Sequence, residues 1–351
     1  MSRKSNQIDE DGHLKNTVKL NYMERKTFLK SLLGGATLIT ASTLIAMDGF
    51  SSIVNALSHD NNNNNNSSDF ATYGAIHLNI TNIKKATFFW TKIVGMKLRE
   101  ASGIRAEFGT ETKTLVVVHE TAKKPFQKGY SGLYHFAIHA PNVAEFASMI
   151  NRLNVNRYPY SPIDHTMSKS IYLDDPDGIN IEFTLETPER FKRVVTTGGL
   201  KIEGADGIVR SASERLNVNE VLNAVNDKNF SKDLSDDSYI GHVHLYANNV
   251  EKSNEFYKKM GFIPFNYLPQ FMYADLGAGG DYQHRIVMNS WHGKNRPLAP
   301  KESAGMRHFQ INYKEKSKLQ QALNNIPNHE EKEAGYWLND ATGNKILVKN
   351  G

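Results

Sequence analysis

The segment GAIHL at residues 74–78 sets the architecture of this chain, because it returns as GHVHL at residues 241–245. A second related pair is GLYHF at residues 132–136 and GMRHF at residues 305–309. All four segments carry a histidine at their fourth position within a short, mainly apolar run typical of a strand. Two pairs with matching flanks indicate an internal repeat rather than coincidence.

Each repeat predicts the same unit of secondary structure. Amphipathic stretches at residues 82–94 and 249–260 follow two of the segments, and each ends at a glycine suited to a helix C-cap (Gly95 and Gly261). Three short strands complete each unit. The four units cover about residues 71–126, 130–190, 238–295 and 303–350. We therefore expect an α+β fold of four βαβββ modules in two pairs, each pair a mixed β-sheet flanked by helices.

The pairs are expected to follow the order of the chain. Residues 71–191 would form an N-terminal module pair, and residues 238–351 a C-terminal module pair. Residues 192–237 are polar and charged, with one expected helix near residues 218–225, and are interpreted as a connector.

The N-terminus has the pattern of an export signal, assigned to residues 1–56. The basic hexamer RKTFLK at residues 25–30 precedes seventeen uncharged residues at 31–47, and VNA at 54–56 suits a cleavage site. The hexamer resembles a twin-arginine motif with Lys26 in the second position, so Tat-like export to an extracytoplasmic or membrane-surface location is expected. A general secretory signal or an uncleaved anchor stays open. Residues 57–70 are an Asn-rich linker.

Composition narrows the functional classes. The chain has 351 residues with a formal net charge of +5 and contains no cysteine, which excludes disulfides, thiolate ligands and a thiol nucleophile. No run of Lys and Arg is interleaved with aromatic residues, so no nucleic-acid partner is expected. Contact with a membrane is expected only through the N-terminal segment.

The stretch from Ile163 to Glu182 concentrates reactive side chains. His165 and Tyr172 precede a DPDG turn at residues 175–178, and Glu182 follows in the middle of the next strand. A carboxylate between Ile181 and Phe183 is costly to bury unless a cation receives it. A metal ion is the simplest such cation.

The same stretch matches, at every specified position, the pattern of extradiol ring-cleavage dioxygenases. Together with the four modules, it makes residues 71–350 resemble the vicinal oxygen chelate superfamily, and most closely the catechol 2,3-dioxygenases of Gram-positive bacteria. The resemblance implies cupped sheets and an Fe(II) ion, or alternatively Mn(II), held by His77, His135 and Glu182. It further implies that His119 is an acid–base group. His165 and Tyr172 would contact substrate and oxygen.

Two imidazoles and one carboxylate leave three adjacent coordination positions open, as in non-haem Fe(II) oxygenases. A catechol and O2 are therefore the expected small-molecule partners. Loss of a catechol proton near neutral pH requires a base, a role that suits His119. A homo-oligomer is compatible with this interpretation.

The C-terminal pair is expected to lack a metal. His244 and His308 take the two histidine positions, but Leu347 stands in place of the glutamate, and His284 could supply a replacement ligand. Two alternatives stay open: another metal-dependent enzyme of the superfamily (a lyase, isomerase or thiol transferase), and a non-enzymatic exported binder of metal or catechol. The first predicts a carboxylate as fourth ligand, and the strand at residues 114–118 has none.

Overall fold

The computed structural model describes residues 68–225 and 229–351. The predicted export signal and most of the predicted linker lie outside these residues. Val195 and the described residues before it form one compact unit with Leu200–Gly351. Within the described part of the chain, no helix combines the length and apolar character needed to cross a membrane.

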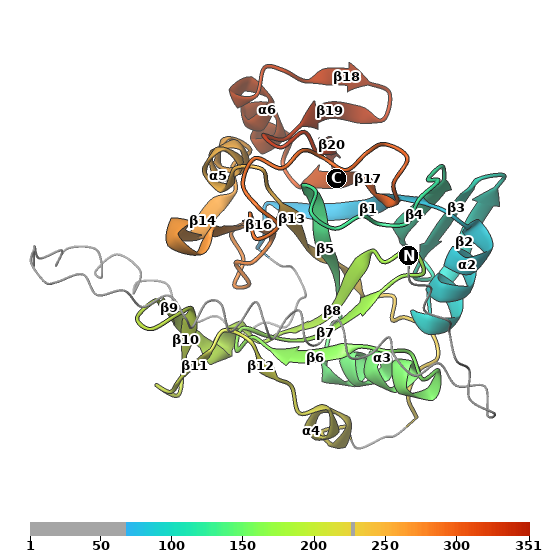
Figure 1. The fold of residues 1–351 in the computed structure, drawn as a ribbon, viewed down its shortest axis with the longest axis vertical. Coiled ribbons are helices and arrows are strands. Elements are labelled where there is room, and N and C mark those ends of the chain that lie inside the picture. The colour runs from blue at the N-terminus through green and yellow to red at the C-terminus, as the bar shows by residue number, and fades with distance from the viewer. Residues whose placement is uncertain (1–67, 226–228) are drawn as a thin grey trace, which may run out of the picture. The chain divides into compact units, whose positions relative to one another are not determined.

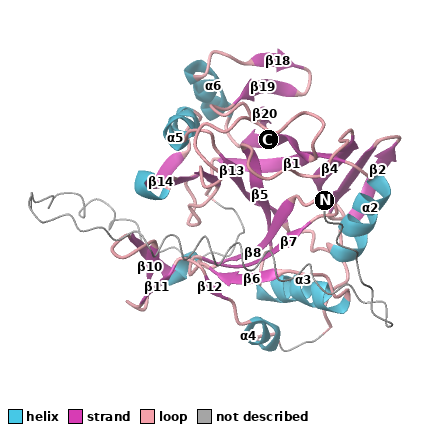
Figure 2. Ribbon diagram, viewed as in Figure 1, coloured by secondary structure: helices cyan, strands magenta, loops and turns pink. Residues whose placement is uncertain are grey.

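Four consecutive βαβββ modules build this unit, as the sequence predicts (Figures 1 and 2). Module 1 comprises β1 (Ala71–Ile80), α2 (Ile83–Phe88) with a π-helical extension (Phe89–Ile93), β2 (Lys97–Ser102), β3 (Arg105–Gly109) and β4 (Thr114–Glu120). Module 2 comprises β5 (Gly132–His139), α3 (Val143–Val155), β6 (Ser161–Asp164), β7 (Ser168–Asp174) and β8 (Asn180–Glu186). Module 3 comprises β13 (Tyr239–Tyr246), α5 (Val250–Lys259), β14 (Ile263–Leu268), β15 (Tyr273–Gly277) and β16 (Ile286–Asn289). Module 4 comprises β17 (Gly305–Tyr313), α6 (Lys316–Asn325), β18 (Glu330–Lys332), β19 (Gly335–Asn339) and β20 (Lys345–Asn350).

The helices of the first three modules begin in the same way. Asn82, Asn142 and Asn249 each cap a helix by accepting a hydrogen bond from the backbone N–H three residues later, at 2.9, 3.0 and 2.9 Å. An asparagine side chain at this position satisfies an N–H group that the helix cannot. The repeated asparagine cap explains why the helix begins at the same point after the first strand of each of these modules.

The modules pair differently from their expected order along the chain. One sheet runs β18-β19-β20-β17-β1-β4-β3-β2 and joins module 4 to module 1. The other runs β12-β6-β7-β8-β5-β13-β16-β15-β14, where β12 is Glu214–Arg215, and joins module 2 to module 3. The expected N-terminal pair (71–191) and C-terminal pair (238–351) are therefore replaced by an outer pair and an inner pair. The repeat itself could not distinguish these arrangements, because every leading strand offers a similar apolar edge.

Both sheets meet along their leading strands. β1 packs near β13, and β17 packs near β5, so one apolar core runs between the two module pairs. Its largest fully buried side chains include Trp90, Phe136 and Phe309. The first strand of each module, here called its leading strand, therefore carries its histidines beside this core.

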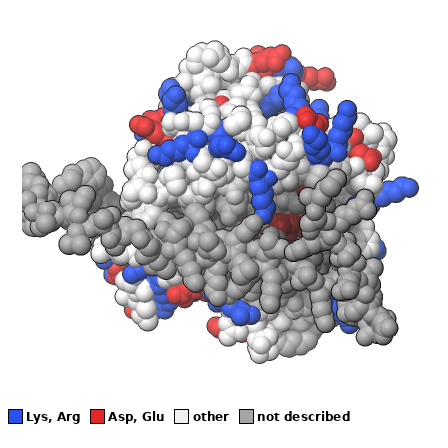
Figure 3. All heavy atoms as spheres, in the orientation of Figure 1, with Lys and Arg blue, Asp and Glu red and all other residues white. Residues whose placement is uncertain are grey.

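The connector adds a three-stranded sheet and a short helix. Its strands are β9 (Phe191–Val195), β10 (Lys201–Gly204) and β11 (Val209–Ser211), and its helix is α4 (Val218–Asn223). In the described part of the face shown in Figure 3, basic and acidic side chains are interspersed. No large patch of one charge sign is visible on that part of the face.

Candidate metal centre

Three buried side chains converge between modules 2 and 3. His135 Nε2 lies 2.9 Å from Glu182 Oε2, and His242 Nε2 lies 3.0 Å from the same oxygen. The two imidazole nitrogens are 3.4 Å apart. Among the described residues, this is the one group of three or more His and acidic side chains whose donor atoms all lie within 4.8 Å of one another.

Strand register brings the three together. β5 runs between β8 and β13 (Figure 1), and Ala137 at its centre lies next to Glu182 on one side and His242 on the other. His135 is two residues before Ala137 and therefore projects from the same face of the sheet. The exposed fractions of His135, Glu182 and His242 are 3%, 2% and 1%, so water does not screen their charges.

The positions of the protons leave a lone pair of His242 facing the centre. Glu186 accepts a hydrogen bond from His139 Nδ1 at 2.7 Å, so His139 Nε2 is the acceptor of that ring. His242 Nδ1 then donates to His139 Nε2 at 2.9 Å. The remaining nitrogen, His242 Nε2, is an acceptor that faces the carboxylate acceptor of Glu182.

Two acceptors at hydrogen-bond distance require either an added proton or a cation between them. Burial lowers the pKa of His242 well below its usual value, despite the nearby carboxylate of Glu182, so the added proton is disfavoured. Donors held 2.0–2.2 Å from a shared ion are about 3.0–3.4 Å apart, close to the three distances in this cluster. The residues therefore fit a divalent ion.

The electrostatics of Glu182 agree with this fit. Burial by itself raises the pKa of this carboxyl, and positive charge on the facing imidazoles of His242 and His135 outweighs burial and lowers it well below its usual value. A cation bound between neutral imidazoles would supply the same charge. Its second oxygen, Oε1, accepts a hydrogen bond from Thr184 at 2.9 Å. Glu182 is thus an ionised donor that is fixed in orientation.

His165 and Tyr172 lie beside the cluster. Tyr172 is the cross-strand partner of Glu182, and its ring packs edge-on against His135 with centroids 5.4 Å apart. His165 Nδ1 donates to the carbonyl of Ala212 at 2.8 Å, so its Nε2 accepts from the Tyr172 hydroxyl at 2.9 Å. Burial lowers the pKa of His165 and keeps the ring neutral.

The structure places His77 and His119 on the other sheet. His77 Nδ1 lies 3.2 Å from His119 Nε2, and the His77 ring stacks on His308 with centroids 3.9 Å apart. The predicted grouping of His77 with His135 and Glu182 is therefore corrected: His242 takes the third position. The reason is the pairing of modules, since β13 rather than β1 lies next to β5. For the same reason His119 is not next to this cluster.

The sequence analysis did not assign three residues to this site: His242 as a candidate ligand, and His139 and Glu186 as the residues that orient it. The signal for His242 was present, because the GHVHL segment carries two histidines on one strand face. His244, the other one, has its ring 4.8 Å from that of His135 and its Nε2 2.8 Å from the amide nitrogen of Asn289.

His284, expected as a replacement ligand, is bound elsewhere. Its Nδ1 lies 2.7 Å from Asp275 Oδ2 and 3.2 Å from the Tyr273 hydroxyl. Its ring centroid is 4.9 Å from that of His242, so it borders the centre without belonging to the convergent group.

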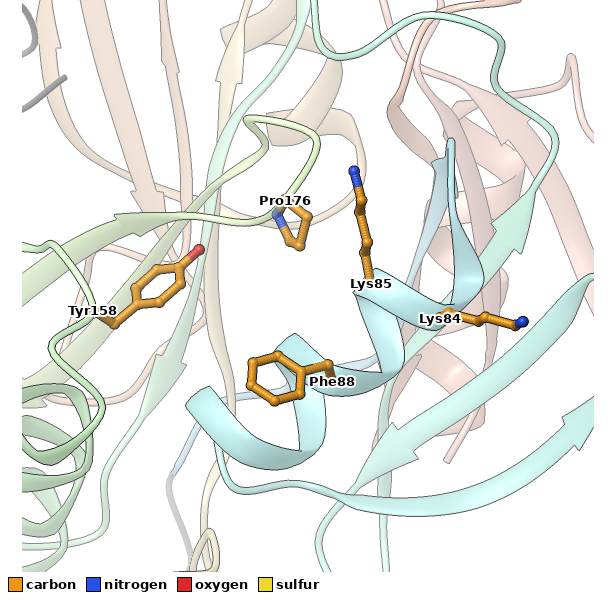
Figure 4. A pocket seen from close by; sticks show the side chains of 5 residues that line it. All are labelled: Lys84, Lys85, Phe88, Tyr158 and Pro176. Carbon is orange, nitrogen blue, oxygen red and sulfur yellow. The ribbon is translucent and has the colours of Figure 1, made fainter. Parts of the chain in front are cut away.

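A surface pocket lies apart from these histidines. Its lining comprises Lys84, Lys85, Phe88, Tyr158 and Pro176 (Figure 4). None of these side chains is a typical metal ligand or a general base near neutral pH. The chemistry of the site therefore belongs to the buried cluster.

The chain is similar to a known family and to a characterised relative. Residues 72–183 match the Glyoxalase/Bleomycin resistance protein/Dioxygenase superfamily. A catechol-2,3-dioxygenase of Bacillus subtilis is 27% identical over 289 residues, which cover 79% of this chain and 93% of that protein.

Two solved structures are similar to this chain over most of its length. One is a Bacillus subtilis protein provisionally described as a dioxygenase, with 12% identity, a TM-score of 0.49, and coverage of 80% of this chain and 86% of that one. The other is glyoxalase I from Zea mays, with 13% identity, a TM-score of 0.45, and coverage of 79% and 92%.

Proposed function

The chain belongs to the Glyoxalase/Bleomycin resistance protein/Dioxygenase superfamily through residues 72–183, and on this basis we propose that it is an Fe(II)-dependent extradiol dioxygenase acting on a catechol. The observation that carries the proposal is the convergence of His135, Glu182 and His242 on one point. The similarity to a catechol-2,3-dioxygenase supports the choice of substrate class. We also propose export through the N-terminal segment.

Two imidazoles and one carboxylate suit a non-haem iron centre. This donor set leaves adjacent positions for other ligands. A bound Fe(II) ion would supply Lewis acidity and a means of bringing a diol and O2 together. Its residual charge of +1 after Glu182 coordination would be neutralised by a catecholate monoanion.

Tyr172 and His165 provide the proton chemistry on the chain's side. The Tyr172 hydroxyl donates to His165 Nε2, so its own oxygen is oriented to accept a proton from a substrate hydroxyl. His165 Nε2 can take the Tyr172 proton in turn, because its Nδ1–H is already committed to Ala212. This pair replaces His119 as the proposed acid–base group.

Two rival functions receive less support. A lyase, isomerase or thiol transferase of the superfamily would favour a second carboxylate among the ligands, and the convergent group among the described residues has only Glu182. A non-enzymatic binder would not need the hydrogen-bonded pair of Tyr172 and His165.

Activity after anaerobic loading with Fe(II) tests the proposal. We expect O2 uptake and a yellow, ring-opened semialdehyde on addition of catechol. Glu182→Ala and His242→Ala should each lower the rate at least about 100-fold, because the two remaining donors would hold a divalent ion much more weakly than three. His329→Ala is the matched control, since His329 bonds the nearby Ile326 carbonyl and packs edge-on against Tyr336, and belongs to no part of the cluster.

His77→Ala distinguishes the two possible ligand sets. Ring cleavage should persist in this variant, because His77 lies on the sheet of modules 1 and 4. Loss of ring cleavage in His77→Ala together with its retention in His242→Ala would contradict the proposed centre. Absence of O2 uptake with several catechols would favour the rival functions.

A further inference from the structure

Arg285 is a buried cation beside the candidate metal centre, and the proposed proton chemistry does not use it. It directly precedes β16 in module 3. Its Nη1 donates both to the carboxylate of Glu186 and, at 3.3 Å, to the backbone carbonyl of Gly241. Glu186 orients His139, and Gly241 is the residue before the candidate ligand His242. One guanidinium group therefore contacts both supports of that ligand.

Gly241 has to be a glycine for this arrangement. The register of β13 against β5 is irregular between Ile240 and His242, which places Gly241 in a β-bulge. A Cβ atom at Gly241 would lie 2.1 Å from Cγ and 2.3 Å from Nδ1 of His139. The imidazole of His139 therefore rests directly on the backbone of Gly241. Any shift of this backbone would move the ring that accepts a hydrogen bond from His242 Nδ1.

Asp69 holds the other end of the guanidinium. Its Oδ2 accepts from Arg285 Nε at 2.9 Å, and its Oδ1 accepts from the backbone N–H of Gly280 at 2.9 Å. The ring of Tyr282 packs against the guanidinium, with its centroid 4.9 Å from Arg285 Cζ. Because the guanidinium is planar, fixing Nε and Nη1 determines its orientation. Asp69 thus fixes the direction in which the arginine donates.

The charges of this group favour a cation at the centre. Arg285 lies between two carboxylates, Asp69 and Glu186, so the three ionised groups together carry one negative charge. The arginine by itself would repel a divalent ion, but the two carboxylates outweigh it. A buried ion pair adds little stability compared with well-packed apolar side chains, whereas its hydrogen bonds are directional. A positioning role therefore explains this group better than stability alone.

We propose that Arg285, held by Asp69, is a positioning residue of the candidate metal centre. It fixes the carboxylate and the backbone that hold His139. That ring keeps the proton of His242 on Nδ1, so that Nε2 is left to bind the ion. This role rests on the proposed function, since it takes over the ligand set of that proposal, and it adds two residues that act on the ligands through others.

Arg285→Lys tests the geometry at constant charge. A single ammonium group cannot bond Asp69, Glu186 and the Gly241 carbonyl at once. We expect chelator competition to show a loss of Zn²⁺ affinity of about 10-fold, the lower end of the range for losing a residue that orients a ligand. The matched control is Arg152→Lys, at a buried arginine that donates to backbone carbonyls elsewhere in the molecule. This control should lower the stability but leave the Zn²⁺ affinity within about 2-fold of the wild type.

Asp69→Asn is a milder variant, because the amide keeps the shape of the side chain and loses only its charge. The weaker hold on Arg285 should lower the Zn²⁺ affinity by about 3- to 10-fold, less than the loss of the arginine's own contacts. Circular dichroism and the melting temperature of the metal-free protein verify that each variant is folded. Asp69→Asn carries the test should Arg285→Lys fail to fold.

NMR of the histidine side chains in the metal-free protein shows the proton positions directly. In the wild type, His139 and His242 should each carry a proton on Nδ1, whereas in both variants His242 should populate both tautomers. Unchanged Zn²⁺ affinity in folded Asp69→Asn and Arg285→Lys, or one unchanged tautomer of His242, would overturn the positioning role. None of these measurements needs a catechol or O2, so a failure of ring cleavage alone would contradict only the proposed function. A wild-type protein that retained no Zn²⁺ would overturn the centre and the positioning role together.

Discussion

Glu186 connects the candidate metal centre to the rest of the polar interior. It accepts hydrogen bonds from His139, from the Tyr239 hydroxyl at 2.8 Å and from the Arg285 guanidinium. His139 and Arg285 outweigh the effect of burial and lower the pKa of Glu186, so it is ionised at neutral pH. A fixed carboxylate at this place determines which nitrogen of His139 carries the proton, and through His139 the tautomer of His242.

We therefore predict that Glu186→Gln weakens metal binding at the candidate metal centre by about 10- to 100-fold, the usual effect of losing such a partner. The neutral amide removes the charge that holds His139 in one tautomer. Chelator competition with Zn²⁺ measures this affinity. Asp340→Asn is the matched control, because Asp340 is a buried carboxylate that bonds Tyr257 in another part of the molecule. Equal metal affinities for Glu186→Gln and the parent protein would contradict the inference that Glu186 sets the tautomer of His242 through His139.

The burial of the Asp175 carboxyl predicts that the free energy of unfolding depends on pH. Its Oδ1 accepts from the backbone of Asp177 and Ile179, at 2.9 and 2.8 Å, while its buried Oδ2 has no hydrogen-bond partner among the described residues. Burial is the main cause that raises its pKa to about 7. The folded state therefore binds a proton that the unfolded state has lost between about pH 4 and pH 7, and stability falls as the pH rises through this window.

Asp175→Asn should remove this dependence. The amide keeps an acceptor for the two backbone N–H groups and cannot ionise. Relative to the wild type, the variant should gain on the order of 3 kcal/mol between pH 4.5 and pH 7.5, since one pKa unit corresponds to about 1.4 kcal/mol. Thermal melts across this range measure the difference. Parallel curves for the two proteins would show that Asp175 is ionised throughout.

Single residues show why the sequence revealed part of the site and missed the rest. Glu182, His165 and Tyr172 lie within one hairpin, so local spacing was enough to group them. His135 was identified through its place in the repeat. The choice between His77 and His242 depended on which strand lies beside β5, a long-range contact that leaves no local trace in the sequence.

Among the secondary-structure elements, α3 has an unusual role because it anchors the connector. The Arg152 guanidinium is buried and donates to the carbonyls of Val94, Lys232 and Asp233 at 2.7, 2.9 and 2.9 Å. Burial lowers its pKa to about 10, so the side chain is still charged at neutral pH. One helix thereby satisfies backbone groups from module 1 and from the connector.

Arg152→Lys should lower the free energy of unfolding by about 2–3 kcal/mol, because an ammonium group cannot reach all of these carbonyls and a buried unsatisfied polar group costs about 1–3 kcal/mol. Urea denaturation measures this loss, and limited proteolysis should show faster cleavage near residues 231–233. Arg210→Lys, in an exposed pair with Asp206, is the control and should change stability by less than about 1 kcal/mol. Equal losses in the two variants would rule out an anchoring role for Arg152.

The repeat predicted four modules, and the structure contains four, because turn residues, asparagine caps and alternating strands act locally. The pairing of those modules depends on which edges of the leading strands meet. β1 and β5 both present apolar edges, and antiparallel pairing with β17 and β13 closes an outer and an inner sheet. Both clusters of histidines consequently draw on residues from each half of the chain.

This arrangement makes a strong prediction about fragments. Residues 68–237 contain β5 and β8 but lack β13, so they lack His242 and the strand that should cover β5. Residues 238–351 contain β13 and β17 without their partners. Neither fragment expressed alone should bind Zn²⁺ with the affinity of the intact chain, and each should expose an unpaired strand edge that promotes aggregation. Co-expression of the two should restore a soluble complex that retains metal, because all strand pairs of both large sheets are then present. If residues 68–237 alone bound one equivalent tightly and lost it on His77→Ala, the modules would pair in chain order, and the centre built on His242 would have to be abandoned.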